Sequence, residues 1–492
     1  MRSGSRAARV APAAAALFLS AGCLVGPNYS RPAASNDAGY APAMRAGQTG
    51  PPAFDYGRGI PAEWWALFRS DRLDEVLRRA IAANHTLAAA SFTLAQAREA
   101  IVAARSGYYP HVDFGASLRR GASGFGAPTN LFALGPTVSY SIDAFGETRR
   151  QVEQASAIAE RQNYELAAAY LALTGGSVTE AITIAAARLE IATVEDIIKN
   201  DQKNLDLTRR AFDAGRVAKA DVLTAESQLE ADRTLLPTLH QQLNVARHAL
   251  TVLVGETPAQ WTPPDFEMQE FTLPPTLPVS LPSDLVRQRP DILSAEAELH
   301  ADSAAIGVAT AQMYPQITLS ASLLQEAVAL ADLFKQAGSL WSVGGDADAP
   351  LYHGGALAAQ KRAATDAYRA QLELYQDTVL GAFQQVADVL SALEEDAALV
   401  AAAEQSLTIS SDSLRLQRSS YTAGKTSALQ LIIAENIHSQ ALLSNARAQA
   451  QRMQDSAQLF VALGGGWWND GVLPPAAADR PEPSRASSPR AD

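Results

Sequence analysis

Residues 109–118 read YPHVDFGASL and residues 314–323 read YPQITLSASL, so one pattern occurs twice, 205 residues apart. After each Tyr-Pro pair, apolar and polar residues alternate. Because successive side chains of a β-strand point to opposite faces, the alternation predicts strands with one apolar and one polar face. Two more alternating segments, 137–143 and 341–349, follow in the chain. The sequence therefore predicts two pairs of strands.

Other landmarks repeat at nearly the same offset. Residues 212–216 (FDAGR) correspond to residues 421–425 (YTAGK), 209 residues later. Residues 252–255 (VLVG) correspond in the same way to residues 461–464 (VALG). Three landmarks in one order at one spacing indicate an internal duplication.

Long helical segments are predicted between the strand pairs. The segment 146–212 has 67 residues without a proline, which corresponds to roughly 100 Å of helix. We expect a turn at 213–215, where glycine suits a left-handed cap, and a return through 219–254 and 284–314. One long arm is thus matched by two shorter arms. The second repeat follows the same plan with predicted arms at 355–421, 427–463 and 73–109.

Four strands are too few to close a barrel, since about eight is the smallest common number. Two copies of the chain would give eight strands around a filled interior, and three copies would give twelve strands around an open bore. A half-buried sheet in a soluble domain fits the alternation as well. The long predicted loops 119–133 and 324–338 favour a membrane barrel. In that case four carboxylates are predicted to line a cation-preferring lumen: Asp113, Asp143, Asp346 and Asp348.

Composition excludes several classes of protein. The 492 residues carry a formal net charge of −12, with 40 Lys+Arg and 52 Asp+Glu, and no basic cluster that would bind nucleic acid. A single cysteine permits neither a disulfide framework nor a thiolate metal site. No HExxH, P-loop or G-x-S-x-G motif is present, so we expect no enzyme, no cofactor and no metal. After the first two dozen residues no run of 18 apolar residues occurs, which argues against a transmembrane helix.

The N-terminus has the features of an export signal. Three arginines precede the short apolar segment 10–19, and small residues then lead to Cys23, the only cysteine. The stretch 19–23 (LSAGC) resembles the lipobox of bacterial lipoproteins, which predicts a signal peptide at 1–22 and acylation of Cys23. The alternative is an ordinary signal peptide with an incidental cysteine. By this resemblance, Leu24 in place of an aspartate indicates the outer membrane.

Two further stretches carry a family resemblance. Residues 23–32 (CLVGPNYSRP) resemble the opening of outer-membrane efflux lipoproteins of the outer-membrane factor family. Residues 285–296 (LVRQRPDILSAE) resemble the signature of that family, which centres on Arg289, Pro290 and Asp291. We interpret the signature itself as a helix start, with Pro290 in the first turn and Asp291 complementing the helix N-terminus.

The resemblance implies an α+β membrane protein. Each chain would supply four transmembrane β-strands and long α-helical hairpins in two structural repeats. Three chains would form a 12-stranded β-barrel continued by a 12-helix periplasmic tunnel. It also implies passive export through the outer membrane, with energy supplied by an RND-type inner-membrane transporter and a periplasmic adaptor. In this family the adaptor meets the hairpin tips, which here are Ala214, Gly215, Arg216, Val217 and Ala218, and Ala423, Gly424, Lys425, Thr426 and Ser427.

The family commonly carries a periplasmic gate just inside the second tip, built from Leu, Asp and Arg. The corresponding positions here are Leu429, Ile433 and Asn436, so only the leucine is kept. Asp221 on the first hairpin is the nearest acidic candidate. We therefore predict a gate that closes by apolar contact and dewetting instead of an ion pair.

The predicted organisation follows from these boundaries. It comprises a signal peptide (1–22), a lipidated linker (23–62), a periplasmic helical tunnel (63–109, 146–314 and 355–464) with equatorial segments (255–283 and 465–469), two strand pairs of the barrel (110–145 and 315–354) and a disordered tail (470–492). Two alternatives to drug efflux remain. One is an export duct for proteins or polysaccharides in a type I-like system, and the other is a structural coiled-coil lipoprotein.

Overall fold

The computed structural model describes residues 24–33, 40, 53–122, 128–335 and 338–468. The chain divides into two compact units, each assembled from segments far apart in sequence. The first comprises residues 1–33, 93–163 and 294–377, and the second comprises residues 34–92, 164–293 and 378–492. The predicted signal peptide, Cys23 and the tail 470–492 lie outside the described residues.

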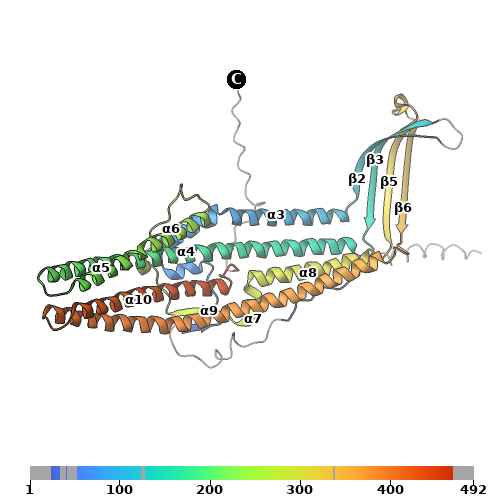
Figure 1. Cartoon of the computed structure of the whole chain (residues 1–492). Helices are drawn as coiled ribbons and strands as arrows, with labels where there is room; N and C mark the ends of the chain where they lie inside the picture. Colours follow the sequence, from blue (N-terminus) through green and yellow to red (C-terminus); the bar gives the residue numbers. More distant parts are fainter. Residues whose placement is uncertain (1–23, 34–39, 41–52, 123–127, 336–337, 469–492) are drawn as a thin grey trace, which may run out of the picture. The chain divides into compact units, whose positions relative to one another are not determined.

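Unit 1 contains a four-stranded antiparallel sheet in the order β2-β3-β5-β6 (Figure 1). The strands are β2 (His111–Gly121), β3 (Thr129–Ile142), β5 (Gln316–Ala327) and β6 (Ser339–Asp348). Each predicted strand is present, but β3 begins eight residues earlier than expected and β5 runs to Ala327. β3 continues through Pro136, although this residue cannot donate a ladder hydrogen bond. The predicted loops 119–133 and 324–338 are correspondingly too long.

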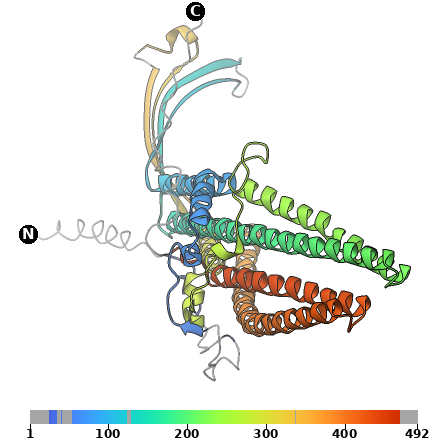
Figure 2. The same ribbon diagram turned by 90° about the vertical axis from the view of Figure 1, so that its left-hand side faces the viewer.

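Two helices of 67 residues leave the strands, α4 (Glu147–Asp213) and α9 (Ala356–Thr422). Their lengths match the prediction from the proline-free segments. Within unit 2, α4 is paired with α5 (Lys219–Arg233), and α9 with α10 (Ala428–Ala462), in two hairpins (Figures 1 and 2). An ideal Cβ on Gly175 of α4 would lie 2.5 Å from Val461 Cγ2 of α10, so this helix crossing requires glycine.

The shorter arms are each interrupted, which corrects the prediction of continuous helices. The arm 219–254 consists of α5 and α6 (Leu235–Leu253), because the ring of Pro237 conflicts with the carbonyl of residue 233. The arm 284–314 contains α7 (Pro282–Gln288) and α8 (Pro290–Ala311), with extended backbone at Arg289 before the proline. The arm 73–109 divides into α2 (Asp71–Ala83) and α3 (His85–Arg105), and Asn84 Oδ1 between them accepts a hydrogen bond from Leu87 N.

The core of unit 2 is aromatic. Trp64 and Phe68, both fully buried in a short 3-10 helix (Trp64–Phe68), pack against Phe460 of α10, and Phe68 also meets Phe271. Beside this core, β1 (Ala53–Tyr56) pairs in parallel with β4 (Thr276–Val279). The predicted linker, 23–62, therefore contributes the strand β1, which pairs with β4 of the equatorial segment. This short strand was not predicted because the sequence around it is rich in proline and glycine.

No helix among the described residues is both long and apolar enough to cross a membrane.

Candidate functional site

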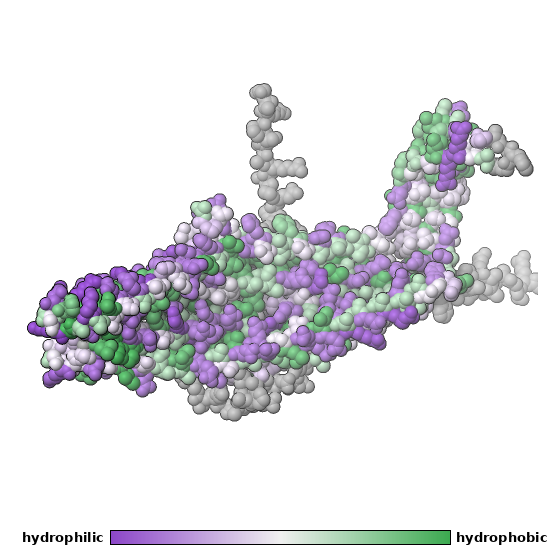
Figure 3. Space-filling model, viewed as in Figure 1, coloured by the Kyte–Doolittle hydropathy of each residue, from purple (hydrophilic) through white to green (hydrophobic). Residues whose placement is uncertain are grey.

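The register of the sheet in unit 1 separates polar from apolar residues into two faces. One row across the four strands is Val112, Val138, Ala321 and Val343. The next row is Asp113, Thr137, Ser322 and Ser342, in which the hydroxyls of Ser322 and Ser342 are 2.9 Å apart. Because neighbouring rows point to opposite faces, the sheet has one apolar and one hydroxyl-rich face. Figure 3 shows both classes of residue on the strands.

Three of the four predicted lumen carboxylates belong to the polar face. Asp113 pairs with Thr137, Asp346 with Thr318, and Asp348 with Gln316. Asp143 was wrongly included, because β3 ends at Ile142. The Asp143 carboxylate instead accepts hydrogen bonds from Thr148 N (3.0 Å) and Arg149 N (3.2 Å) at the start of α4, and forms an ion pair with the Arg149 guanidinium. Its chemistry is that of a helix cap.

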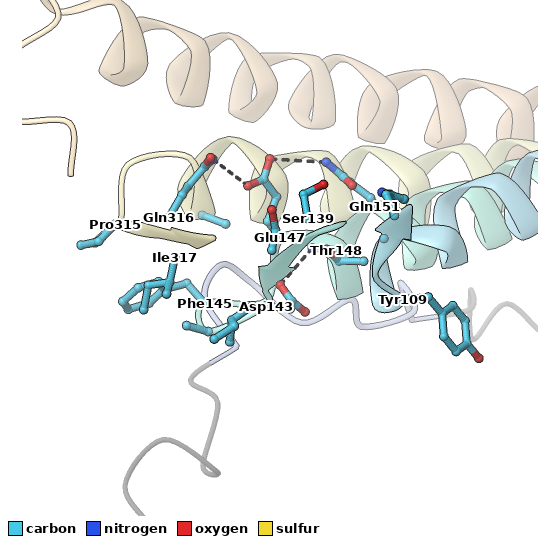
Figure 4. Close-up of a pocket in the computed structure, with 16 residues that line it drawn as sticks. Tyr109, Ser139, Asp143, Phe145, Glu147, Thr148, Gln151, Pro315, Gln316 and Ile317 are labelled. Carbon is cyan, nitrogen blue, oxygen red and sulfur yellow. Dashed lines mark hydrogen bonds between the residues drawn. The ribbon is translucent and has the colours of Figure 1, made fainter. Parts of the chain in front are cut away.

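A polar cavity of about 280 Å³ lies where the strands meet the helices (Figure 4). Glu147, in the first turn of α4, accepts hydrogen bonds there from Gln312 Nε2 (3.2 Å), Gln316 Nε2 (3.1 Å) and Gln151 Nε2 (3.4 Å). Phe145 stacks on Tyr314 at 4.8 Å between ring centroids. These contacts join the beginnings of α4 and β5, and thus fix the sheet of unit 1 to its helices.

The predicted hairpin tips are two near-identical turns in unit 2. Gly215 and Gly424 both have φ of +70°, where glycine avoids the strain of a Cβ. After α4, Gly215 N donates to Phe212 O and Arg216 N to Ala211 O, and the corresponding bonds recur after α9. This pair of backbone hydrogen bonds is the Schellman motif. An open groove of about 810 Å³ is lined by both tips, including Arg216, Val217, Ala218, Thr426 and Ser427.

The gate candidates lie beside these tips but differ in their surroundings. Leu429 and Ile433 of α10 are 52% and 49% exposed, and Ile437 continues the row at helical spacing. Asn436 is half-buried and lines a small cavity of about 10 Å³. Asp221 accepts a hydrogen bond from Ala218 N at 2.9 Å, so it caps the start of α5. Figure 3 shows apolar surface among hydrophilic residues at this end of unit 2.

The Arg-Pro-Asp signature does more than begin a helix. Arg289 forms an ion pair with Asp291 through two hydrogen bonds, of 2.6 and 3.0 Å. Its remaining nitrogen donates to Gln385 Oε1 of α9 (2.8 Å) and to Ala462 O at the end of α10 (2.7 Å). Arg289 therefore connects the start of α8, the middle of α9 and the end of α10. Sequence reasoning missed these partners because they lie 96 and 173 residues away.

Sequence reasoning also missed the residues that bind the N-terminal strap, which we define as residues 24–32. Arg150 of α4, 1% exposed, donates to Val25 O, Gly26 O and Asn28 Oδ1 of the strap. Tyr29 stacks on His300 at 4.4 Å, and Arg31 forms an ion pair with Glu296. The only available signal was Arg150 itself, a charged residue in a segment of helical period.

Within residues 24–33, 40, 53–122, 128–335 and 338–468, no group of three or more His, Cys, Asp or Glu side chains could hold a metal ion. The site is accordingly a set of surfaces: a polar sheet face, two hairpin tips and an apolar row on α10.

Comparison with known proteins identifies this architecture. The model of the outer membrane efflux protein family matches residues 76–256 and 281–465. The pyoverdine export outer membrane protein OpmQ of Pseudomonas aeruginosa is 28% identical, over 83% of this chain and 88% of its own. The antibiotic efflux pump outer membrane protein ArpC of Pseudomonas putida is 27% identical, over 92% and 94%. The solved outer-membrane channel OprN aligns with a TM-score of 0.84 and 27% identity, over 90% of this chain and 100% of its own.

These comparisons confirm the predicted fold class. Channels of this type are homotrimers in which a β-barrel continues into a helical tunnel, and they reside in the outer membrane and extend into the periplasm. Since the family model covers about three quarters of the residues and the alignments span nearly the whole chain, the chain belongs to the outer membrane efflux protein family.

Proposed function

We propose that the protein is the outer-membrane channel of a tripartite efflux pump and passively conducts small toxic compounds from the periplasm to the exterior. The observation that carries the proposal is the hydroxyl- and carboxylate-bearing face of the four-stranded sheet. Three copies, joined at the free edges of β2 and β6, would turn this face toward a bore of twelve strands. Cys23, if acylated, would anchor each strap in the same membrane.

The partners belong to this proposal. A passive channel needs an energy source elsewhere, which we assign to an inner-membrane transporter of the RND type. The adaptor would meet the two Schellman turns, 214–218 and 423–427, because residues of both turns line one groove. Small cargo is favoured over proteins or polysaccharides because two relatives are named for export of pyoverdine and of antibiotics.

We further propose that Leu429 and Ile433 close the periplasmic mouth by apolar contact. Both side chains are half-exposed in the single chain and lie on one face of α10. A ring of such residues from three copies would exclude water from the mouth without any ion pair. Neither Asn436, which is uncharged, nor Asp221, which caps α5, supplies the ion pair of the family pattern.

Single-channel conductance of the purified protein in planar bilayers tests the proposal. We expect discrete, cation-selective steps that are small or rare in the closed channel and several-fold larger or more frequent in Leu429→Ala. The matched control is Leu223→Ala on α5, whose side chain is similarly exposed at 54%. Equal currents in the two variants would remove Leu429 from the gate, and silence in wild type and all variants would refute conduction.

A further inference from the structure

Each hairpin of unit 2 places a buried aspartate of one helix against a half-buried aspartate of the other. In the first, Asp201 of α4 faces Asp232 of α5, and in the second, Asp396 of α9 faces Asp455 of α10. Asp201 and Asp396 are only 7% and 6% exposed. Like charges at such depth would repel strongly and lack hydration, so the arrangement is costly if both carboxyls are ionised.

The hydrogen bonding around the two pairs is the same. Gln228 Nε2 donates to Asp232 and Gln451 Nε2 donates to Asp455, each from four residues earlier and at 2.8 Å. The buried oxygen Oδ2 of Asp201, and likewise that of Asp396, accepts no hydrogen bond from any described residue. Each of the two buried carboxyls is hydrogen-bonded to its partner carboxyl, and one of two carboxyls can donate only when it carries a proton.

The neighbouring charges do not neutralise the first pair. From α10, Glu435 adds a further carboxylate, and its own partners are Asn204 and, at 3.4 Å, Arg418 of α9. On α5, the neighbouring Arg233 is bonded to Glu230 and Gln202. The cavity beside Asp201, of about 10 Å³, has room for a single water at most. Around Asp396, the Arg452 guanidinium of α10 is the charged group besides Asp455 that acts on the carboxyl.

We propose that the two aspartates of each pair share one proton, and that this hydrogen bond holds the two helices of the hairpin together; we call it the clasp. Loss of that proton to solvent leaves two facing carboxylates and loosens the hairpin. An aspartate pair occurs in both hairpins, although at positions that the internal repeat does not make equivalent. We infer that both helix pairs need such a contact. The clasp is separate from the gate residues and does not depend on what the channel conducts.

The electrostatics give the direction of the pH effect. Burial, then the hydrogen bond and charge of Asp232, raise the pKa of Asp201 to about 8, and burial with the same influences of Asp455 raises the pKa of Asp396 to about 7. A carboxyl with a raised pKa in the folded state binds more protons folded than unfolded. Stability is therefore greatest at acid pH and falls as pH rises through about 7 for the second hairpin and about 8 for the first.

Infrared difference spectroscopy of the full-length protein in detergent tests the shared protons directly. We expect the C=O stretch of protonated carboxyls to persist at neutral pH and to disappear between about pH 7 and pH 9. Asp232→Asn and Asp455→Asn each remove the hydrogen bond and the charge of the partner carboxyl, while burial of the remaining aspartate still raises its pKa. Each variant should therefore shift one component of this titration to lower pH. Disappearance of the whole band below about pH 5 in wild type would overturn the proposal.

Hydrogen exchange read by mass spectrometry tests the mechanical consequence. After correction for the intrinsic pH dependence, amides of α4 and α5 should exchange several-fold faster at about pH 9 than at pH 6, and those of α9 and α10 likewise. Asp232→Asn should abolish this acceleration in the first hairpin only, and Asp455→Asn in the second only. The controls Asp206→Asn on α4 and Asp388→Asn on α9 replace exposed aspartates and should leave it intact. Acceleration that persists in both pair variants would contradict the clasp.

Discussion

At the scale of single residues, Arg289 shows how one side chain stabilises contacts between distant segments. Its side chain is 11% exposed, and its guanidinium donates a hydrogen bond to the carbonyl of Ala462, a residue that is fully buried. Arg289→Ala leaves this carbonyl without a donor, which costs about 1–3 kcal/mol. We expect the apparent Tm of the purified channel to fall by several degrees, as measured by thermal unfolding.

Two variants sharpen the Arg289 prediction. Arg289→Lys keeps the charge but not the planar fork, so it should recover only part of the loss. Arg287→Ala removes an exposed arginine from α7 and should leave the Tm within error of wild type. Equal Tm values for Arg289→Ala and Arg287→Ala would show that the contacts of Arg289 contribute little.

The residue scale also shows where sequence reasoning ends. The signature indicated that Asp291 begins a helix, because capping depends on neighbours along the chain. The bond from Arg289 to Ala462 was not predictable, since no local pattern records a partner 173 residues away. Asp143 shows the opposite failure. It continued the alternation of β3 by one position, yet two backbone N–H groups of α4 determine its place.

At the scale of elements, the strap depends on a close approach between glycines. An ideal Cβ on Gly307 of α8 would lie 2.6 Å from Arg150 Cδ, and one on Gly26 of the strap would lie 2.5 Å from Gly307 Cα. Gly307→Ala should therefore displace Arg150 and release the strap. We expect faster exchange of the strap amides and faster proteolysis within residues 24–32.

The chain offers a matched control for this change. Gly381 lies in α9 with no atom within 4 Å of an ideal Cβ, so Gly381→Ala should be neutral or slightly stabilising. Strap exchange that is unchanged in Gly307→Ala would show that helix and strap adjust without separating. Extension of the comparison to Arg150→Met tests whether the lost hydrogen bonds, and not only the steric clash, release the strap.

The length of an element was predictable where residues near its ends in the sequence determine it. The two 67-residue helices were anticipated because prolines are absent inside them and a glycine turn ends each. The break at Thr234 was missed because Pro237 occupies the first turn of a new helix, where proline is tolerated. The helix start at Pro290 was predicted from the signature, although the arm 284–314 was expected to be helical throughout. The helical pattern therefore continues in the sequence across an interruption of the backbone.

At the scale of the whole molecule, the sheet of one chain is incomplete. Within the described residues, β2 and β6 each pair with one strand only, and every residue of both strands is exposed. Long edges of this kind promote association unless a partner covers them. In a homotrimer of this family, equivalent sheets supply the missing neighbours. Under the proposal that the polar face lines the bore, the apolar face of β6 would contact lipid.

Adjacent residues of β6 separate these two environments. Val343 shares its row with Val112, Val138 and Ala321, whereas Ser342 faces the other way and meets Ser322. Val343→Arg would place a charge in lipid near the middle of the strand, at a cost of roughly 2–4 kcal/mol per chain, repeated in three chains. We expect the yield of outer-membrane trimer, assayed by membrane fractionation and gel electrophoresis without heating, to fall strongly for Val343→Arg. Ser342→Arg places the same charge toward water and should assemble normally while reducing cation selectivity in bilayers. If instead Ser342→Arg blocks assembly and Val343→Arg does not, the two faces are reversed and the polar row does not line the bore.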